Sequence, residues 1–342
     1  MKLKPIHEQV IVVTGASSGN GLATAEMAAA KGAAVVLVAR NEAALETIRS
    51  RIEASGGRAV ACVADVSDED AVAHIVDTAL KAYEGFDSWV NNAAVAAYGT
   101  LEQIPIADHR RIFDVNYFGV LYGSLAATRH LRGRGGAIIN VGSVLSDRAI
   151  LQQGPYCATK HAVEALTETL RMELEREGAG ISVTLVKPGP IDTLFPEHAR
   201  NYMDVPPRLP PPLYHPDLVA DAVLFACTHP RRSLYVGGGG LLSALIGRAA
   251  PRLTDFVMEA VGTRMQQKPG DPGDPQRRDN LYEPRADGKR RGSQDVGSRR
   301  TSLTLQAQKY PARAGLMAVG SVVVLAIAGR SLVRRGGAKR DR

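Results

Sequence analysis

The sequence contains little cysteine. Only 3 of its 342 residues are cysteine, and Cys62, Cys157 and Cys227 lie far apart with no Cys-x-x-Cys pair among them. This spacing excludes a disulfide-stabilised scaffold and a cysteine-based zinc site, so we expect no metal, and it is typical of a reducing compartment. The first residues lack a long apolar run. We therefore expect no secretory signal and a cytoplasmic location.

The chain also lacks a strong charge of one sign, except in its last quarter. The formal net charge is +7, but residues 1–263 carry 24 basic and 28 acidic side chains, whereas 264–342 carry 18 basic and 7 acidic ones. A nucleic-acid-binding role for the whole protein therefore loses its main support. The basic excess belongs to the C-terminal part, which can meet an anionic surface.

Short runs rich in Val, Ile and Leu alternate with helix-like segments over the first 240 residues. Most of these runs show no in/out alternation, which is typical of parallel strands buried on both faces. Strands are expected at 10–14, 34–39, 59–63, 89–91, 137–141, 182–186 and 233–236, and helices at 41–55, 68–83, 107–131 and 156–177. This order predicts an α/β fold, Rossmann-like and doubly wound, with a mostly parallel seven-stranded sheet and helices on both faces.

The C-terminal part breaks this pattern. Residues 264–313 are rich in Pro, Gly, Arg and Asp, which predicts a disordered basic linker after a nucleotide-binding domain at 1–263. The uncharged stretch 314–329 follows, as an expected helix of about 24 Å, which is short of the roughly 30 Å hydrocarbon core of a bilayer. With the basic end 330–342, it predicts a helix on the cytoplasmic leaflet of a membrane. The alternative is a helix packed on a partner subunit.

A glycine-rich stretch lies where the first expected strand turns into the first helix. It reads Thr14-Gly15-Ala16-Ser17-Ser18-Gly19-Asn20-Gly21. Glycines here let the backbone turn sharply and approach a pyrophosphate, whose charge the helix N-terminus favours. No Gly-Lys-Ser/Thr sequence follows, which argues against a mononucleotide P-loop. The candidate cofactor-binding residues are Gly15, Ser17, Ser18, Asn20 and Gly21.

The end of the second expected strand indicates which dinucleotide is bound. The strand ends Val38-Ala39-Arg40, without the acidic residue that would accept the ribose 2′-hydroxyl of NAD. Arg40 can instead pair with the 2′-phosphate of NADP(H), which is the expected cofactor. The alternative is an ordinary surface arginine.

Three further residues form a candidate catalytic set. Tyr156 and Lys160 are four residues apart in an expected helix and therefore share one face. An ammonium beside a phenol favours the phenolate and lowers the phenol pKa, which suits proton transfer near neutral pH. Ser143 follows the strand expected at 137–141, at the edge where doubly wound sheets bind ligands.

Together these residues resemble the short-chain dehydrogenase/reductase family, in its compact single-domain branch, over roughly residues 1–240. The resemblance rests, in the family's order and spacing, on the stretch 14–21, Asp65, Asn91-Asn92-Ala93-Ala94, Asn116, Ser143, Tyr156-x-x-x-Lys160 and Pro188-Gly189. Two positions depart from the family pattern. Asn20 replaces an apolar residue and Ala94 replaces a glycine, and either change can weaken cofactor binding.

The resemblance implies hydride transfer between the nicotinamide C4 of NADP(H) and a carbonyl or alcohol carbon. In this scheme Ser143 hydrogen-bonds the carbonyl oxygen and Tyr156 delivers or takes the proton. Lys160 binds the ribose hydroxyls and lowers the Tyr156 pKa, and Asn116 holds a water that links Lys160 to solvent. The resemblance also assigns the adenine to Asp65 and Val66, support of the cofactor to Asn92 and Ala93, and the nicotinamide side to Pro188, Gly189, Ile191 and Thr193.

The loops expected to face the substrate are apolar. They carry Val95, Tyr98, Val144, Leu145, Ile150, Leu151, Phe195, Tyr202 and Met203, and the proline-rich stretch 189–216 is expected to form a lid. We therefore expect a lipophilic ketone, aldehyde or alcohol as substrate, and a homo-oligomer. Two alternatives stay open: an epimerase or dehydratase that reuses the same residues, and a catalytically idle NADP-binding scaffold recruited to a membrane or partner by its tail.

Overall fold

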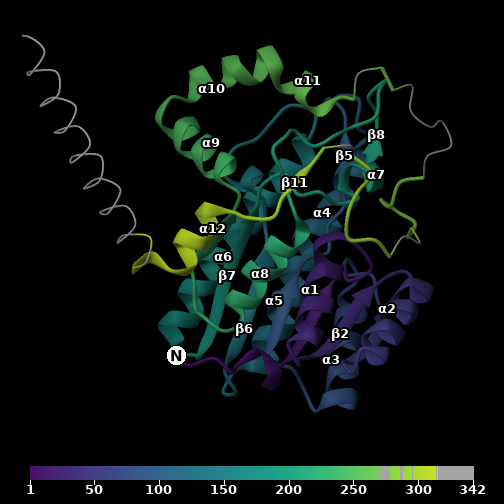
Figure 1. Ribbon diagram of the computed structural model, residues 1–342, viewed down its shortest axis with the longest axis vertical. Helices are drawn as coiled ribbons and strands as arrows, with labels where there is room; N and C mark the ends of the chain where they lie inside the picture. The colour runs from purple at the N-terminus through teal and green to yellow at the C-terminus, as the bar shows by residue number, and fades with distance from the viewer. Residues whose placement is uncertain (269, 272–277, 286–287, 295, 313, 315–342) are drawn as a thin grey trace, which may run out of the picture.

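A seven-stranded parallel sheet forms the centre of the protein (Figure 1), as the sequence predicts. The computed structural model describes residues 1–268, 270–271, 278–285, 288–294, 296–312 and 314. The strand order is β10-β7-β6-β4-β1-β2-β3. The strands are β1 (Val10–Thr14), β2 (Ala34–Ala39), β3 (Arg58–Val63), β4 (Ser88–Asn91), β6 (Gly136–Val141), β7 (Ile181–Pro188) and β10 (Ser233–Val236).

Helices cover both faces of the sheet, each over its own apolar core. One core joins the sheet to α1 (Gly19–Ala30), α2 (Glu42–Ala54) and α8 (Pro216–Ala226). The other core joins it to α3 (Glu69–Tyr83), α5 (Gly119–Leu131) and α6 (Gly154–Glu177). Strands such as β2, whose residues are all buried, need no polar face because they lie between these two layers.

Local sequence signals explain where several helices begin and end. The Asn41 side chain accepts a hydrogen bond from the Ala44 N–H at 2.8 Å and caps α2, and Asp68 caps α3 in the same way. The helix expected at 107–131 is instead three segments: α4 (Ile106–Phe113), a π-helical turn η2 (Asp114–Phe118) and α5. The sequence does not reveal this turn, although π-helical turns are frequent at functional sites.

The strand order reverses beside β1, because β2 and β3 lie on one side of it and β4 on the other. In doubly wound sheets this arrangement opens a crevice at the carboxyl ends of the strands. The loops above the crevice contain the short elements η3 (Val144–Ser146), β5 (Ala97–Tyr98), α7 (Phe195–His198), β8 (Arg200–Asn201) and β9 (Leu213–Tyr214). A further short helix, η1 (Ile6–Glu8), precedes β1.

The C-terminal extension, residues 237–312, packs back onto the sheet. It begins with a helical arm formed by α9 (Gly238–Ala249), α10 (Pro251–Val257), η4 (Met258–Gly262) and α11 (Thr263–Gln266), drawn in green at the top of Figure 1. Later in the extension, β11 (Ser298–Arg299) pairs with β9, and α12 (Leu303–Lys309) packs on β10.

The prediction of a disordered linker over 264–313 is wrong for the described residues of that range. Leu281 and Leu305 are both 0% exposed and anchor the segment to the rest of the protein. Two isolated buried leucines give no detectable signal in a segment whose composition is dominated by Pro, Gly and Arg. The expected helix 314–329 and the basic end 330–342 lie outside the described residues, apart from Ala314. Within the described part of the chain, no helix is long and apolar enough to cross a membrane.

Candidate active site

A cavity of about 520 Å³ opens at the carboxyl edge of the sheet, where the strand order reverses. This volume falls within the range of about 300–1,000 Å³ that is typical of ligand sites. The structure brings all but two of the predicted site residues to its lining. These are Gly15, Ser17, Ser18, Asn20, Arg40, Asp65, Val66, Asn92, Ala93, Ser143, Tyr156, Lys160, Pro188, Gly189, Ile191 and Thr193. Gly21 and Asn116 lie behind the lining.

The glycine-rich turn needs its glycines for steric reasons. Gly15 has φ +66°, which favours glycine, and a Cβ on Gly21 would lie 2.0 Å from the Gly15 carbonyl oxygen. Asn92 stabilises the turn, because its Nδ2 donates a hydrogen bond to the Thr14 carbonyl at 2.9 Å. The turn and the N-terminus of α1 thus form a rigid cradle with partial positive charge, suited to an anion.

Arg40 and Asp65 lie at one end of the cavity, which we term the adenosine end. Asp65 Oδ2 accepts a hydrogen bond from Arg111 Nη2 at 2.6 Å, whereas Arg40 Nη1 stays 3.9 Å from the same oxygen. Burial alone would raise the pKa of Asp65, but the hydrogen bonds from Arg111 and Ser67 outweigh burial and lower it. Arg111 escapes sequence analysis, because an arginine in an expected helix gives no sign of its partner.

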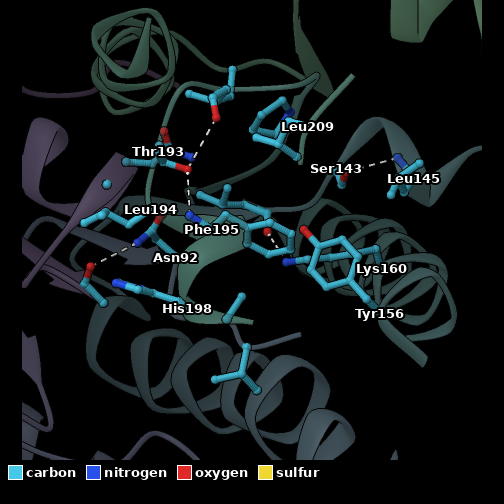
Figure 2. A pocket seen from close by; sticks show the side chains of 18 of the residues that line it. Asn92, Ser143, Leu145, Tyr156, Lys160, Thr193, Leu194, Phe195, His198 and Leu209 are labelled. Carbon is cyan, nitrogen blue, oxygen red and sulfur yellow. Dashed lines mark hydrogen bonds between the residues drawn. The ribbon is translucent and has the colours of Figure 1, made fainter. Parts of the chain in front are cut away.

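Tyr156, Lys160 and Ser143 lie together at the opposite end. Figure 2 shows Tyr156 beside Lys160 and Phe195, with the Lys160 Nζ 5.4 Å from the centroid of the Tyr156 ring. Nζ donates to the Val141 carbonyl at 2.9 Å, and burial lowers the pKa of Lys160 to about 8. The Ser143 hydroxyl accepts from the Leu145 N–H at 3.1 Å, which fixes the serine at the start of η3.

The expectation that Lys160 lowers the Tyr156 pKa is not met in this structure. Burial raises the pKa of the Tyr156 phenol above its ordinary value, the neighbouring Cys157 adds to the rise, and a hydrogen bond with Ser143 opposes it. Desolvation dominates because an apolar environment disfavours the phenolate. Tyr156 is therefore held as a protonated phenol, which is a proton donor.

Asn116 fastens the wall of the cavity and does not face it. Its Oδ1 accepts from the Val95 N–H at 2.8 Å, and its Nδ2 donates to the Val95 carbonyl at 2.9 Å and to Thr159 Oγ1 at 3.2 Å. The residue is 0% exposed and lies within the π-helical turn η2. These contacts use both N–H groups of the side-chain amide and hold it against the Val95 backbone and Thr159.

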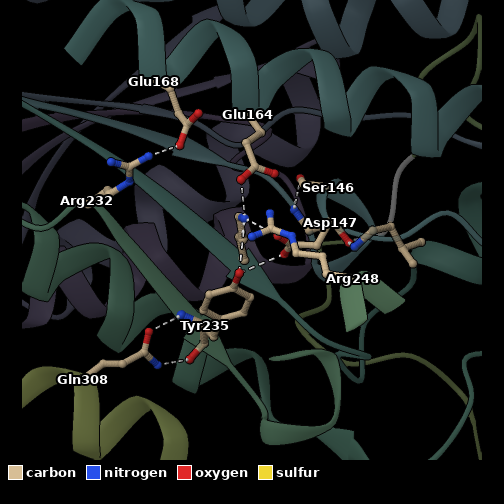
Figure 3. Close-up of polar contacts among 11 residues, drawn as sticks. Ser146, Asp147, Glu164, Glu168, Arg232, Tyr235, Arg248 and Gln308 are labelled. Atoms are coloured by element: carbon tan, nitrogen blue, oxygen red, sulfur yellow. Dashed lines mark hydrogen bonds and ion pairs between the residues drawn. The ribbon is translucent and has the colours of Figure 1, made fainter. Parts of the chain in front are cut away.

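A buried charged cluster forms around Asp147, in the loop that follows Ser143 (Figure 3), and was missed by sequence analysis. Lys187 Nζ donates to Asp147 Oδ1 at 2.9 Å and to Glu164 Oε1 at 2.6 Å, and the Tyr235 hydroxyl donates to Asp147 Oδ2 at 2.9 Å. The cluster ties the loop after Ser143 to α6, β7 and β10. The available signal was a lysine, the one charged residue of the strand Ile181–Pro188, immediately before Pro188.

Apolar side chains from the loops expected to face a substrate line part of the cavity, although not all the predicted ones do so. Val95, Val144, Leu145, Ile150 and Phe195 line it, together with part of the proline-rich loop. Four predicted residues do not line it: Tyr98, Leu151, Tyr202 and Met203. Packing explains two of these, since Tyr98 is 0% exposed in a neighbouring apolar cluster and the Tyr202 hydroxyl donates to Asp108 at 2.6 Å.

The C-terminal extension supplies lining residues that sequence analysis did not identify, some from the end of the predicted domain 1–263 and some from the predicted linker. The helical arm contributes Ser243, Met258 and Met265 among others, and residues further along contribute Asn280, Pro284 and Arg285. The extension therefore closes the cavity on two sides.

The chain is similar in sequence to a known family and to several relatives. Residues 9–203 match the sequence model of the family described as short chain dehydrogenase. The chain is 42% identical over 325 residues to "Uncharacterized oxidoreductase YxnA" of Bacillus subtilis (strain 168), a match that covers 94% of this chain and 91% of that protein. It is 38% identical over 200 residues to 3beta-hydroxysteroid dehydrogenase 1 of Eggerthella lenta, covering 57% of this chain and 75% of that protein.

Solved structures are similar over the sheet domain. A short chain dehydrogenase/reductase from Burkholderia phymatum in complex with NAD has a TM-score of 0.65 and 26% identity, and covers 74% of this chain and 96% of its own. A gluconate 5-dehydrogenase from Burkholderia cenocepacia, in complex with NADP and tartrate, has a TM-score of 0.60 and 27% identity, and covers 69% of this chain and 96% of its own. The sheet topology, the family match and these relatives agree, and the chain belongs to the short-chain dehydrogenase/reductase family of oxidoreductases.

Proposed function

We propose that the protein is an NADP(H)-dependent oxidoreductase that transfers a hydride between the nicotinamide and a carbonyl or alcohol carbon. The observation that carries this proposal is the lining of a single cavity. Ser143, Tyr156 and Lys160 lie at one end of it, and the glycine-rich turn and Arg40 lie toward the other. A catalytically idle NADP-binding scaffold would need only the glycine-rich turn and Arg40.

The residues present fit a dinucleotide. Glycines at 15 and 21 let the turn pack tightly against Asn92 and Ala93. The N-terminus of α1 favours an anion, and because its Gly19 N–H donates to the Lys289 carbonyl of the extension at 2.9 Å, an anion would meet the other N–H groups of the turn. The Asn20 side-chain oxygen, which is buried and has no hydrogen-bond partner among the described residues, can be met by a ribose hydroxyl. Pro188, Gly189, Ile191 and Thr193 would enclose the nicotinamide, and NADPH, when bound, supplies the hydride.

The preference for NADP(H) rests on Arg40. Related structures hold NAD in one case and NADP in another, so family membership alone leaves the choice open. Here β2 ends at Ala39 and is followed by an arginine. A guanidinium forms a charge-assisted pair with a phosphate, which favours the 2′-phosphorylated cofactor.

Proton transfer falls to Tyr156. In the reducing direction a negative charge develops on the substrate oxygen, and a positioned donor is needed to meet it. The raised pKa of Tyr156 keeps its phenol protonated for this task. Ser143 can hydrogen-bond the same oxygen, and Lys160 can bind the ribose hydroxyls with its ammonium group. Asn116 maintains the wall that holds these groups in place.

The apolar lining supports a lipophilic ketone, aldehyde or alcohol as substrate. The similarity to a 3beta-hydroxysteroid dehydrogenase agrees with this choice. The experiment is a screen of NADPH oxidation with ketones and aldehydes graded by lipophilicity. We expect kcat/KM to rise with the lipophilicity of the substrate. A preference for polar sugars or hydroxy acids would contradict the proposed substrate class but not the proposed hydride transfer.

We also propose that the protein acts in the cytoplasm as a homo-oligomer and binds an anionic membrane surface through residues 314–342. Support comes from the uncharged and basic stretches of that segment, and from the outer face of the arm, where Leu242, Leu245 and Phe256 are 58%, 58% and 65% exposed. The full-length protein should pellet with anionic vesicles and be partly released by salt. If it ignores vesicles but changes its oligomeric state when 314–342 is removed, the segment is a subunit contact.

A further inference from the structure

Residues 278–285 cross the adenosine end of the cavity, and we term this segment the strap. Contacts of Leu281, Tyr282 and Asp279 hold it in place. Leu281 is 0% exposed in an apolar cluster with Val66 and Val115, and its carbonyl accepts from Arg111 Nε at 3.0 Å. The Tyr282 hydroxyl donates to Asp108 Oδ1 at 2.8 Å, and Asp279 Oδ2 accepts from Arg200 Nε at 2.8 Å. The strap is thus fixed to α4, to β8 and to the floor of the site.

The strap orients the residue proposed to choose the cofactor. Arg40 donates from Nη1 to the Tyr282 carbonyl at 2.6 Å and from Nη2 to the Asn280 carbonyl at 2.5 Å. Carbonyl groups carry no net charge, so they position the guanidinium without neutralising it. The remaining N–H groups of Arg40 stay available to a phosphate. The carboxylate of Asp65 makes its close contact with Arg111, at 2.6 Å, and its longer ion pair with Arg40 Nη1 spans 3.9 Å.

Asn280 brings an unused acceptor to the same place. It lines the cavity, and its Oδ1 is buried with no hydrogen-bond partner among the described residues. Its backbone N–H donates to the His198 carbonyl at 2.8 Å, and its side-chain Nδ2 lies 3.4 Å from His198 Nδ1, so both the backbone and the amide contact α7. A buried acceptor left unmet costs stability, which is a reason to look for the donor that meets it.

The other acceptor expected at this end is already engaged. Asp65 Oδ1 accepts from the Ser67 N–H at 3.0 Å and from the Ser67 hydroxyl at 2.7 Å, and Oδ2 accepts from Arg111. Both carboxylate oxygens of Asp65 therefore already accept hydrogen bonds from the protein, whereas Asn280 Oδ1 accepts none among the described residues. A hydrogen-bond donor on the adenosine half of a dinucleotide can bind to Asn280 Oδ1. Adenosine offers two kinds of donor, the adenine amino group and the ribose hydroxyls.

We propose that Asn280 is a cofactor-binding residue, whose Oδ1 accepts a hydrogen bond from the adenosine half of the bound dinucleotide. The strap thereby completes the cofactor site from a part of the chain that lies outside the family match at 9–203. The inference rests on the proposed function, because it requires that the cavity bind a dinucleotide. The match to the Bacillus subtilis relative covers 94% of the chain and therefore extends well beyond the family match at 9–203.

The test compares the wild-type protein with Asn280→Ala and with a control, Gln306→Ala, which removes an exposed amide from α12 of the same extension. Binding of NADPH, of NADH and of their hypoxanthine analogues is measured by fluorescence titration, without turnover. The loss of one hydrogen bond should weaken binding of NADPH and NADH alike by about threefold to tenfold in Asn280→Ala, and Gln306→Ala should bind as the wild type does. Thermal unfolding of each variant shows that the fold is retained.

The analogues identify the donor, since hypoxanthine lacks the amino group. If the amino group is the donor, the wild type binds the analogues more weakly and Asn280→Ala loses that discrimination. If a ribose hydroxyl is the donor, both proteins treat adenine and hypoxanthine alike, yet the alanine variant still binds more weakly. An Asn280→Ala variant with wild-type affinity would overturn the role of Asn280 alone. A wild-type protein that binds neither dinucleotide would overturn the proposed function with it.

Discussion

The region matched by the family, 9–203, and the C-terminal extension, 237–312, contribute to the same cavity in different ways. In the first region the site residues follow the ends of buried strands or lie on the helix α6, so a regular backbone places them. In the extension the segments near the site are short or irregular, and long-range contacts such as that between Arg40 and the Tyr282 carbonyl hold them. The chemistry thus depends on the sheet, whereas closure of the site depends on individual side chains.

The largest expected effect lies in the family region. Tyr156→Phe removes the proton donor and keeps the ring, so carbonyl reduction should fall by about two to four orders of magnitude while NADPH binding is retained. Steady-state kinetics and a binding titration measure the two quantities separately. The control is Tyr98→Phe, a buried tyrosine of the same apolar cluster that does not line the cavity. Near-normal turnover in Tyr156→Phe would show that the proton comes from another group.

The next effect tests whether the extension belongs to the folded unit. Leu281→Ala removes an anchor that is 0% exposed, and the free energy of unfolding of the segment should fall by about 2–5 kcal/mol. Leu303→Ala, at a position 85% exposed on α12, is the matched control and should change it by less than about 0.5 kcal/mol.

Limited proteolysis near the strap measures local opening of the segment, and urea denaturation measures the free energy of unfolding of the domain. Both are needed, because a segment can open locally before the whole domain unfolds. Equal protease resistance of the two leucine variants would mean that the strap is not anchored through Leu281.

A smaller effect lies at Arg40, where the two regions meet. NADPH should bind at least about tenfold more tightly than NADH, a difference of about 1.4 kcal/mol, because the guanidinium pairs with the 2′-phosphate. Arg40→Asp should shrink or invert this ratio, whereas Arg110→Asp, the same charge change at an exposed position on α4, should leave it unchanged. Isothermal titration with both cofactors measures the ratio. Equal affinity of the wild type for NADPH and NADH would contradict the assignment.

The smallest effect concerns pH. Burial lowers the pKa of Lys160 to about 8, so its ammonium is charged below that pH and neutral above it. Since kcat/KM reports groups of the free enzyme, kcat/KM for NADPH should decline by a few-fold as the pH rises through about 8. The raised pKa of Tyr156 keeps the phenol protonated over this range. Lys160→Arg retains the charge and should move the decline to higher pH, and a flat wild-type profile from about pH 7 to 9 would exclude the ammonium from cofactor binding.

Much of the structure could be predicted from local sequence patterns. The seven strands were predictable because unbroken apolar runs bounded by turns have few alternatives to burial in a parallel sheet. The glycine-rich turn and Ser143, Tyr156 and Lys160 were predictable because their spacing relative to those strands places them at one edge. The π-helical turn around Asn116 and the cluster around Lys187 were not, since each depends on partners from several elements.

The sequence by itself determined the sheet, its order of elements and the residues at its carboxyl edge, because these follow from periodicity and from the chemistry of short motifs. Only the tertiary structure decided what surrounds that edge. It showed that burial sets the Tyr156 pKa, that Arg111 engages Asp65, and that a segment rich in Pro, Gly and Arg returns to the site through Leu281. A single buried leucine carries no periodic signal, and its partners lie more than a hundred residues away in the chain, so packing alone reveals it.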